Sequence, residues 1–109
     1  MKTSELTGHA LNWAVARCEG GVGADQLIGT WYSPSTNWAQ GGPIIEREKM
    51  SLSCGDGTWG VAEGKWEASH PKCLYVEHGA TPLEAAMRCY VVSVLGDEVE
   101  IPEEINKET

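Results

Sequence analysis

The clearest hydrophobic pattern in the chain lies between residues 81 and 95. Its apolar side chains recur at the three- and four-residue spacing of one helix face, and they are Leu83, Ala86, Met87, Tyr90, Val91, Val94 and Leu95. Thr81 is a suitable N-cap, Pro82 suits the first helical position, and Glu84 completes a capping box. Gly96 follows as a stop signal. The pattern predicts a deeply packed helix.

Another helix is predicted over residues 7–19. Thr7 is the expected N-cap, and Leu6 and Leu11 occupy the two positions of a hydrophobic staple. The apolar residues that follow at helical spacing are Leu11, Ala14, Val15 and Cys18. Gly20 and Gly21 then end the helix.

A third helix is predicted to end near residue 49, and its start has two interpretations. Three consecutive capping residues at 35–37 favour a start there. Gly41, Gly42 and Pro43 interrupt that stretch, and Pro43 suits the first position of a helix that starts later. The sequence leaves both starts open.

Residues 50–78 have the pattern of β structure. Apolar and polar residues alternate at 50–54, residues 58–63 and 65–69 are further candidate strands, and 74–76 is a short apolar run. His70-Pro71 and His78-Gly79 are predicted loops, and a short strand is predicted at 27–32. The order of elements predicts an α+β fold, a small antiparallel sheet packed with about three helices in a sandwich-like arrangement.

Charge divides the chain into a single domain at 1–96 and an acidic tail at 97–109. The formal net charge is −8, and the eight basic residues are scattered from Lys2 to Lys107. Nucleic acids and anionic membranes attract clustered Lys and Arg, so neither is an expected partner. The chain also lacks a signal-peptide pattern and an apolar run of about 18 residues, so we expect it in the cytoplasm.

Four cysteines, at 18, 54, 73 and 89, include no C-x-x-C motif. In a reducing compartment they are expected as free thiols, with Cys18 and Cys89 as inert core residues of two predicted helices. His70, Cys73 and His78 with Cys54 form a conceivable zinc set, but a second closely spaced ligand pair is missing. The sequence therefore predicts no metal and no cofactor.

Candidate binding residues surround Gly41 and Gly42. Exposed backbone N–H groups at a helix start there would bind a phosphate or carboxylate, with Ser35, Thr36 and Arg47 nearby and Arg88 assisting from the last helix. The plain alternative is a turn that repositions a helix. No G-K-[ST] follows the glycines, so this is not a P-loop.

The aromatic content is unusual, with five Trp and no Phe. Trp fills cores and is also enriched at the centre of binding surfaces. Most of the five are expected in the core. Trp31 and Trp38 lie near Gly-rich stretches and are the candidates for a surface contact.

Three segments, at residues 1–20, 32–50 and 79–105, resemble the NinX family of small accessory proteins of lambdoid temperate phages and prophages. The S-T-N-W-A element at 35–39 and the T-P-L-E-A-A element at 81–86 are also similar to small phage domains described as α/β/α sandwiches. The resemblance implies expression in an infected bacterium. It implies no activity and supplies no catalytic residues.

Together these observations predict a non-enzymatic interaction protein that acts on a host or phage macromolecule, with a protein as the expected partner. One alternative is a protein that sequesters a small anion or a nucleotide signal. The other is an uncharacterised hydrolase, although no converging catalytic groups are indicated. The sequence leaves the oligomeric state open, because the wide apolar face of the last helix could be covered within one chain or by a second copy.

Overall fold

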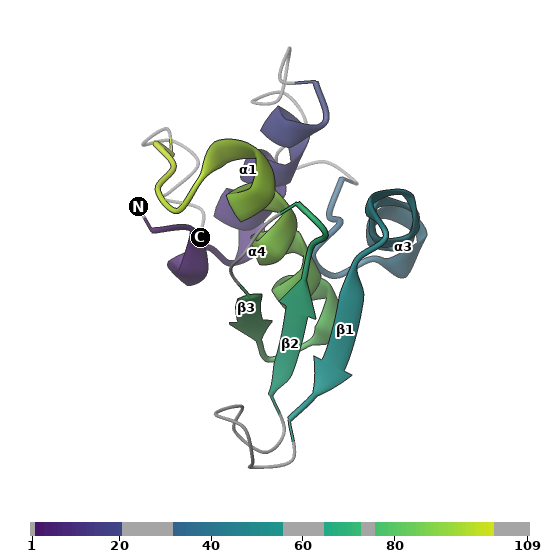
Figure 1. Cartoon of the computed structure of the whole chain (residues 1–109). Helices are drawn as coiled ribbons and strands as arrows, with labels where there is room; N and C mark the ends of the chain where they lie inside the picture. The colour runs from purple at the N-terminus through teal and green to yellow at the C-terminus, as the bar shows by residue number, and fades with distance from the viewer. Residues whose placement is uncertain (1, 21–31, 56–64, 73–75, 102–109) are drawn as a thin grey trace.

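The computed structural model describes residues 2–20, 32–55, 65–72 and 76–101 (Figure 1). In chain order the elements are η1 (Thr3–Glu5), α1 (Gly8–Cys18), α3 (Trp38–Glu48), β1 (Ser51–Cys54), β2 (Trp66–Ser69), β3 (Val76–Gly79) and α4 (Pro82–Leu95). The three strands form one antiparallel sheet in the order β1-β2-β3. The predicted α+β fold is confirmed. No helix in the described residues is long and apolar enough to cross a membrane.

α4 is the centre of the structure and packs against one face of the sheet, with α1 and α3 beside it (Figure 1). Register places Leu52, Ala68 and Glu77 side by side across the three strands. Ala68 is fully buried against the core and Leu52 packs beside it, whereas Ser51 and Ser53, which point to the other face, are exposed. The alternation in β1 thus follows the two faces of the sheet.

The ends of α4 agree with the predicted signals. The Thr81 hydroxyl accepts a hydrogen bond from the Glu84 N–H at 3.1 Å, Pro82 is in the first turn, and Gly96 ends the helix with φ 90°. The Glu84 carboxylate accepts from the Ala80 N–H at 3.1 Å. In this capping box the Glu84 side chain therefore bonds to the N–H of Ala80, the residue before the N-cap.

α1 also lies where its apolar spacing predicts, but its N-cap works differently. Thr7 precedes the helix without making a side-chain cap hydrogen bond. Its hydroxyl instead donates to Glu84 Oε2 at 3.1 Å, which ties the start of α1 to the first turn of α4. Tertiary contact has replaced a local cap.

α3 settles the choice between the two helix starts. It begins at Trp38, and the Asn37 side chain accepts a hydrogen bond from the Ala39 N–H at 2.9 Å. The earlier start is therefore confirmed, and Pro43 lies inside the helix. Gly41 is buried, and a Cβ there would lie 2.6 Å from Leu83 Cδ2, so the glycine permits close packing on α4.

The strand predictions have mixed outcomes. Residues 50–54 and 65–69 correspond to β1 and β2. The predicted loop at His78-Gly79 is wrong, because both residues pair with β2 at Glu67 and Trp66 and so belong to β3. Cross-strand pairing has overridden the local preference of glycine for turns. The predicted strands at 27–32 and 58–63 lie almost entirely outside the described residues.

The first residues of the acidic tail run beside the amino terminus. Thr3 donates its backbone N–H to the Asp97 carbonyl at 2.9 Å and its hydroxyl to the Gly96 carbonyl at 2.7 Å. Val99 is buried and Ile101 packs against the core cluster. Residues 102–109 lie outside the described part, and the boundary at residue 96 stays a prediction.

Candidate functional site

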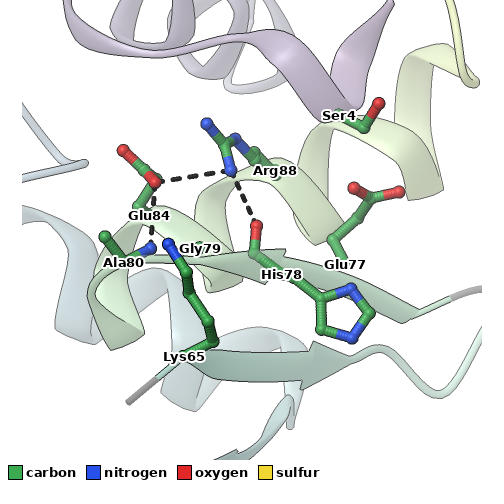
Figure 2. Close-up of a pocket in the computed structure, with 8 residues that line it drawn as sticks. All are labelled: Ser4, Lys65, Glu77, His78, Gly79, Ala80, Glu84 and Arg88. Atoms are coloured by element: carbon green, nitrogen blue, oxygen red, sulfur yellow. Dashed lines mark hydrogen bonds and ion pairs between the residues drawn. The ribbon is translucent and has the colours of Figure 1, made fainter. Parts of the chain in front are cut away.

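A surface pocket of about 470 Å³ lies where the amino-terminal segment, β3 and α4 meet (Figure 2). It is lined by Ser4, Lys65, Glu77, His78, Gly79, Ala80, Glu84 and Arg88. Gly79 also packs closely on α4, since a Cβ there would lie 2.7 Å from the Ala85 nitrogen. The backbone of β3 therefore packs directly against the first turn of α4. Polar side chains beside this contact surround the pocket.

Glu84 and Arg88 form an ion pair of 3.3 Å along one side of α4. Both side chains are also bound to the backbone of other segments. Arg88 donates from Nε to the Leu6 carbonyl at 2.7 Å and from a terminal nitrogen to the His78 carbonyl at 2.7 Å. Glu84 accepts from the Ala80 N–H and the Thr7 hydroxyl. Figure 2 shows the contacts of the pair with His78 and Ala80. Together with the contacts to Leu6 and Thr7, they join the ends of η1, α1, β3 and α4.

These contacts close the outer edge of β3. The N–H and C=O groups of alternate residues point to opposite sides of an antiparallel strand. The His78 carbonyl and the Ala80 N–H, which Arg88 and Glu84 bind, lie two residues apart and point away from β2. A second strand would have to displace both side chains to pair here.

The outer edge of β1 is different. Gly55 donates its backbone N–H to the Lys65 carbonyl at 2.7 Å, which fixes the phase of the β1–β2 ladder. The N–H and C=O groups of Leu52 and Cys54 therefore point away from β2. No described strand pairs with this edge, and three of the four β1 residues are exposed. The strand Ser-Leu-Ser-Cys carries neither a charge nor a proline, the features that usually protect an edge.

A polar network joins the last turns of α1 and α3 to α4. Arg47 donates two hydrogen bonds to the Glu19 carboxylate, at 2.6 and 3.0 Å, and one to the Tyr90 hydroxyl at 3.0 Å. Tyr90 in turn donates to Glu19. The hydrogen bond from Arg47 lowers the pKa of Glu19, and burial together with the bond to Glu19 raises the pKa of Tyr90. Each group is held in its ordinary charge state.

His70 and Glu48 extend this network to the end of β2. The His70 side chain is 3% exposed, and its Nδ1 accepts from the Lys72 N–H at 3.0 Å. The ring proton is therefore on Nε2, which donates to Glu48 Oε1 at 2.9 Å. The bond from His70 and a second from Arg47 lower the pKa of Glu48. Within the described residues no three His, Cys, Asp or Glu side chains are grouped to hold a metal ion.

The residues predicted to bind an anion do not converge on one place. Ser35 is 4% exposed, and its N–H and hydroxyl both donate to the Asn12 side-chain oxygen. Thr36 is exposed, Gly41 is buried, and Gly42 lies beneath the Trp38 ring. Trp38 itself is 54% exposed.

The two predicted arginines lie apart. Arg47 belongs to the network around Tyr90, whereas Arg88 lies at the pocket. Residues two positions apart on a helix point in nearly opposite directions, so Tyr90 and Arg88 face different sides of α4. Arg47 and Arg88 therefore have separate partners, and the binding assignment of the set stays a prediction.

Glu77 and Lys65 line the pocket although sequence reasoning did not select them. Neither belongs to a recognisable motif, and each is an ordinary charged residue in or beside a short strand. The register of β2 and β3 brings them to the same pocket. Residues 76–79 show no apolar–polar alternation, and the sequence predicts His78-Gly79 as a loop, so no strand signal marks Glu77.

These features define a small acidic α+β domain with a polar pocket and a sheet edge that pairs with none of the described strands. Over residues 2–94 the chain matches the family model described as Bacteriophage P22, NinX, and it belongs to that family. The resemblance found in the sequence is thereby confirmed, and the chain is a phage accessory protein. None of the curated proteins compared with the chain matches it.

Proposed function

We propose that this protein is a non-enzymatic interaction protein that pairs the β1 edge with an extended segment of a host or phage protein. The observation that carries the proposal is the contrast between the two edges of the sheet. Side chains of α4 bind the backbone at the outer edge of β3, whereas the outward groups of Leu52 and Cys54 in β1 have no described partner.

Strand addition suits such an edge because the partner supplies the missing ladder. Leu52 and Cys54 together offer two N–H donors and two carbonyl acceptors. At about 0.5–1.5 kcal/mol for each net hydrogen bond, four bonds supply only part of a specific affinity. Side-chain contacts and charge supply the rest. Since the chain carries a net charge of −8, a segment flanked by basic residues is favoured in the encounter.

The state of the polar network supports a role without catalysis. A general acid or base works best with a pKa near the working pH. Glu19 and Glu48 have lowered pKa values, and Tyr90 has a raised one, so all three are shifted away from neutrality. These groups bind one another and are suited to holding α1, α3 and α4 together.

The test is affinity capture from infected cells with two variants of one residue. Cys54→Pro removes the outward N–H and keeps the ladder to β2, because that N–H makes no bond within the sheet. Cys54→Ala removes the same thiol and keeps the N–H. We expect wild type and Cys54→Ala to retain one partner that Cys54→Pro loses, with circular dichroism showing all three folded.

Two results contradict the proposal. One is a folded Cys54→Pro protein that captures the partner as well as wild type does. The other is capture that follows Trp38→Ala and ignores both Cys54 variants, because this would place the interface at the exposed ring at the start of α3.

A further inference from the structure

The pocket beside β3 contains two opposite charges that no described residue neutralises by direct contact. The Glu77 carboxylate and the Lys65 ammonium make no hydrogen bond or ion pair with the described part of the chain, and the Arg88 charge acts on Glu77 only through space. We infer that this pocket binds a linear zwitterion, a short peptide with free ends, whose ammonium group contacts Glu77 and whose carboxylate contacts Lys65. Nothing in this inference depends on the β1 edge.

The remaining charges of the pocket already have partners. Glu84 is bound by Arg88, Thr7 and the Ala80 N–H. Arg88 is bound to Glu84 and to two backbone carbonyls. Figure 2 shows the Lys65 side chain extending toward Gly79 and Ala80, and the Glu77 carboxylate on the other side of the pocket, toward Ser4. Lys65 and Glu77 are therefore the charges that remain available to a ligand.

Charge complementarity favours a ligand with two opposite ends. A simple anion that approached Lys65 would also meet the carboxylates of Glu77 and Glu84 in the same pocket. A simple cation at Glu77 would likewise meet Lys65 and Arg88. A zwitterion that places each end against its opposite charge avoids both conflicts. Burial raises the pKa of Glu77 more than the charge of Arg88 lowers it, so a ligand ammonium stabilises the ionised form that partial desolvation disfavours.

The register of the strands gives an approximate length for this ligand, taken between the backbone positions of the two residues. Trp66 pairs with Gly79, so Lys65 is level with Ala80, three residues beyond Glu77. Three residues of a strand span about 10 Å. An extended tripeptide has about the same length between its ends, because each residue adds roughly 3.3–3.6 Å. The pocket volume of about 470 Å³ accommodates a small peptide of this kind.

The test uses trialanine as the probe, together with its N-acetylated and C-amidated forms. Isothermal titration at neutral pH is expected to show saturable binding of trialanine, with each blocked peptide at least tenfold weaker. Inorganic phosphate is expected not to compete. Failure of trialanine to saturate, equal affinity of the blocked forms, or displacement by phosphate overturns the inference.

Two charge-removing variants assign each end of the peptide. In Glu77→Gln the penalty for acetylating the amine is expected to disappear, while the penalty for amidating the carboxylate remains. Lys65→Gln is expected to give the reverse pattern, as a double-mutant cycle requires for direct pairs. Glu46→Gln and Lys72→Gln, at exposed positions outside the pocket lining, control for net charge. Identical losses in all four variants overturn the assignment, and Cys54→Pro is expected to bind trialanine unchanged.

Discussion

The Arg88 guanidinium donates a 2.7 Å hydrogen bond to the backbone carbonyl of His78, and through it α4 closes one edge of the sheet. The same side chain donates to the Leu6 carbonyl and pairs with Glu84. A residue that sequence reasoning selected for anion binding thus has three protein partners. The contribution of Arg88 to stability and its effect on the sheet edge can be measured separately.

Replacement of Arg88 by Met is expected to destabilise the fold. The variant keeps much of the apolar stem but leaves the Leu6 and His78 carbonyls without their donor. Hydrogen bonds to charged groups contribute about 1.5–3 kcal/mol each, so we expect a loss of roughly 2–4 kcal/mol in the free energy of unfolding. Urea denaturation measures it. Arg17→Met, at an exposed position near the end of α1, is the control and is expected to change stability far less.

Gly41 and Gly42 are expected to respond to alanine with opposite signs. A Cβ at Gly41 would lie 2.6 Å from Leu83 Cδ2 and would also meet the Pro34 carbonyl, so Gly41→Ala is expected to cost about 1–3 kcal/mol. A Cβ at Gly42 would meet only Trp38 Cε3, at an ordinary 3.7 Å. Gly42→Ala is therefore expected to stabilise the helix by roughly 0.5–1 kcal/mol. Thermal unfolding of the two variants measures both changes in stability. Equal changes in the two variants would contradict the packing described for α3.

Acid is expected to weaken the fold through Glu19 and Glu48. Both carboxyl groups have pKa values below the ordinary 4.5 in the folded chain, because Arg47, His70 and Tyr90 donate hydrogen bonds to them. The unfolded chain then binds protons more readily, so the contribution to stability is complete above pH 4.5 and is lost as the pH falls through the folded-state values. The urea midpoint should fall over this range.

The matched variant for the acid effect is Arg47→Met. It removes a hydrogen-bond donor from both carboxylates and is expected to flatten the pH dependence while lowering stability at neutral pH. Since the Arg47 side chain is half exposed, the electrostatic part is screened and should shrink in high salt. An unchanged pH profile in the variant would show that other carboxyl groups dominate acid unfolding.

The thiols are expected to differ in reactivity. Burial raises the pKa of Cys18 to about 12, and Cys89 is fully buried, whereas Cys54 is exposed on β1. Thiolates are the reactive form, so iodoacetamide at neutral pH should modify Cys54 in the folded protein well before Cys18 or Cys89. Peptide mass mapping assigns each site. Equal labelling of Cys18 and Cys54 would contradict the partial burial of Cys18 at the end of α1.

Local signals predicted the helices well. Thr81, Pro82 and Gly96 fixed α4, because caps and apolar spacing act within one helix and need no partner. Strands depend on residues far away in the chain, and His78-Gly79 showed this by pairing with β2 despite a turn-like sequence. The candidate site was harder still. Arg47 pairs with Glu19, which lies 28 residues away in the chain and which no local signal indicates. The i,i+4 spacing of Glu84 and Arg88 was readable in the sequence, but the Leu6 and His78 carbonyls that Arg88 also binds were not.

The sequence by itself determined the helix boundaries of α1 and α4, the α+β class, the acidic balance and the family. These follow from short-range periodicity, capping and motif similarity. Only the tertiary structure decided that Glu77 and Lys65 share a pocket, that Glu84 and Arg88 close the β3 edge, and that the edge of β1 pairs with no strand in the described residues. The reason is that strand register and the packing of α4 on the sheet set these relationships, and both depend on contacts between residues distant in the chain.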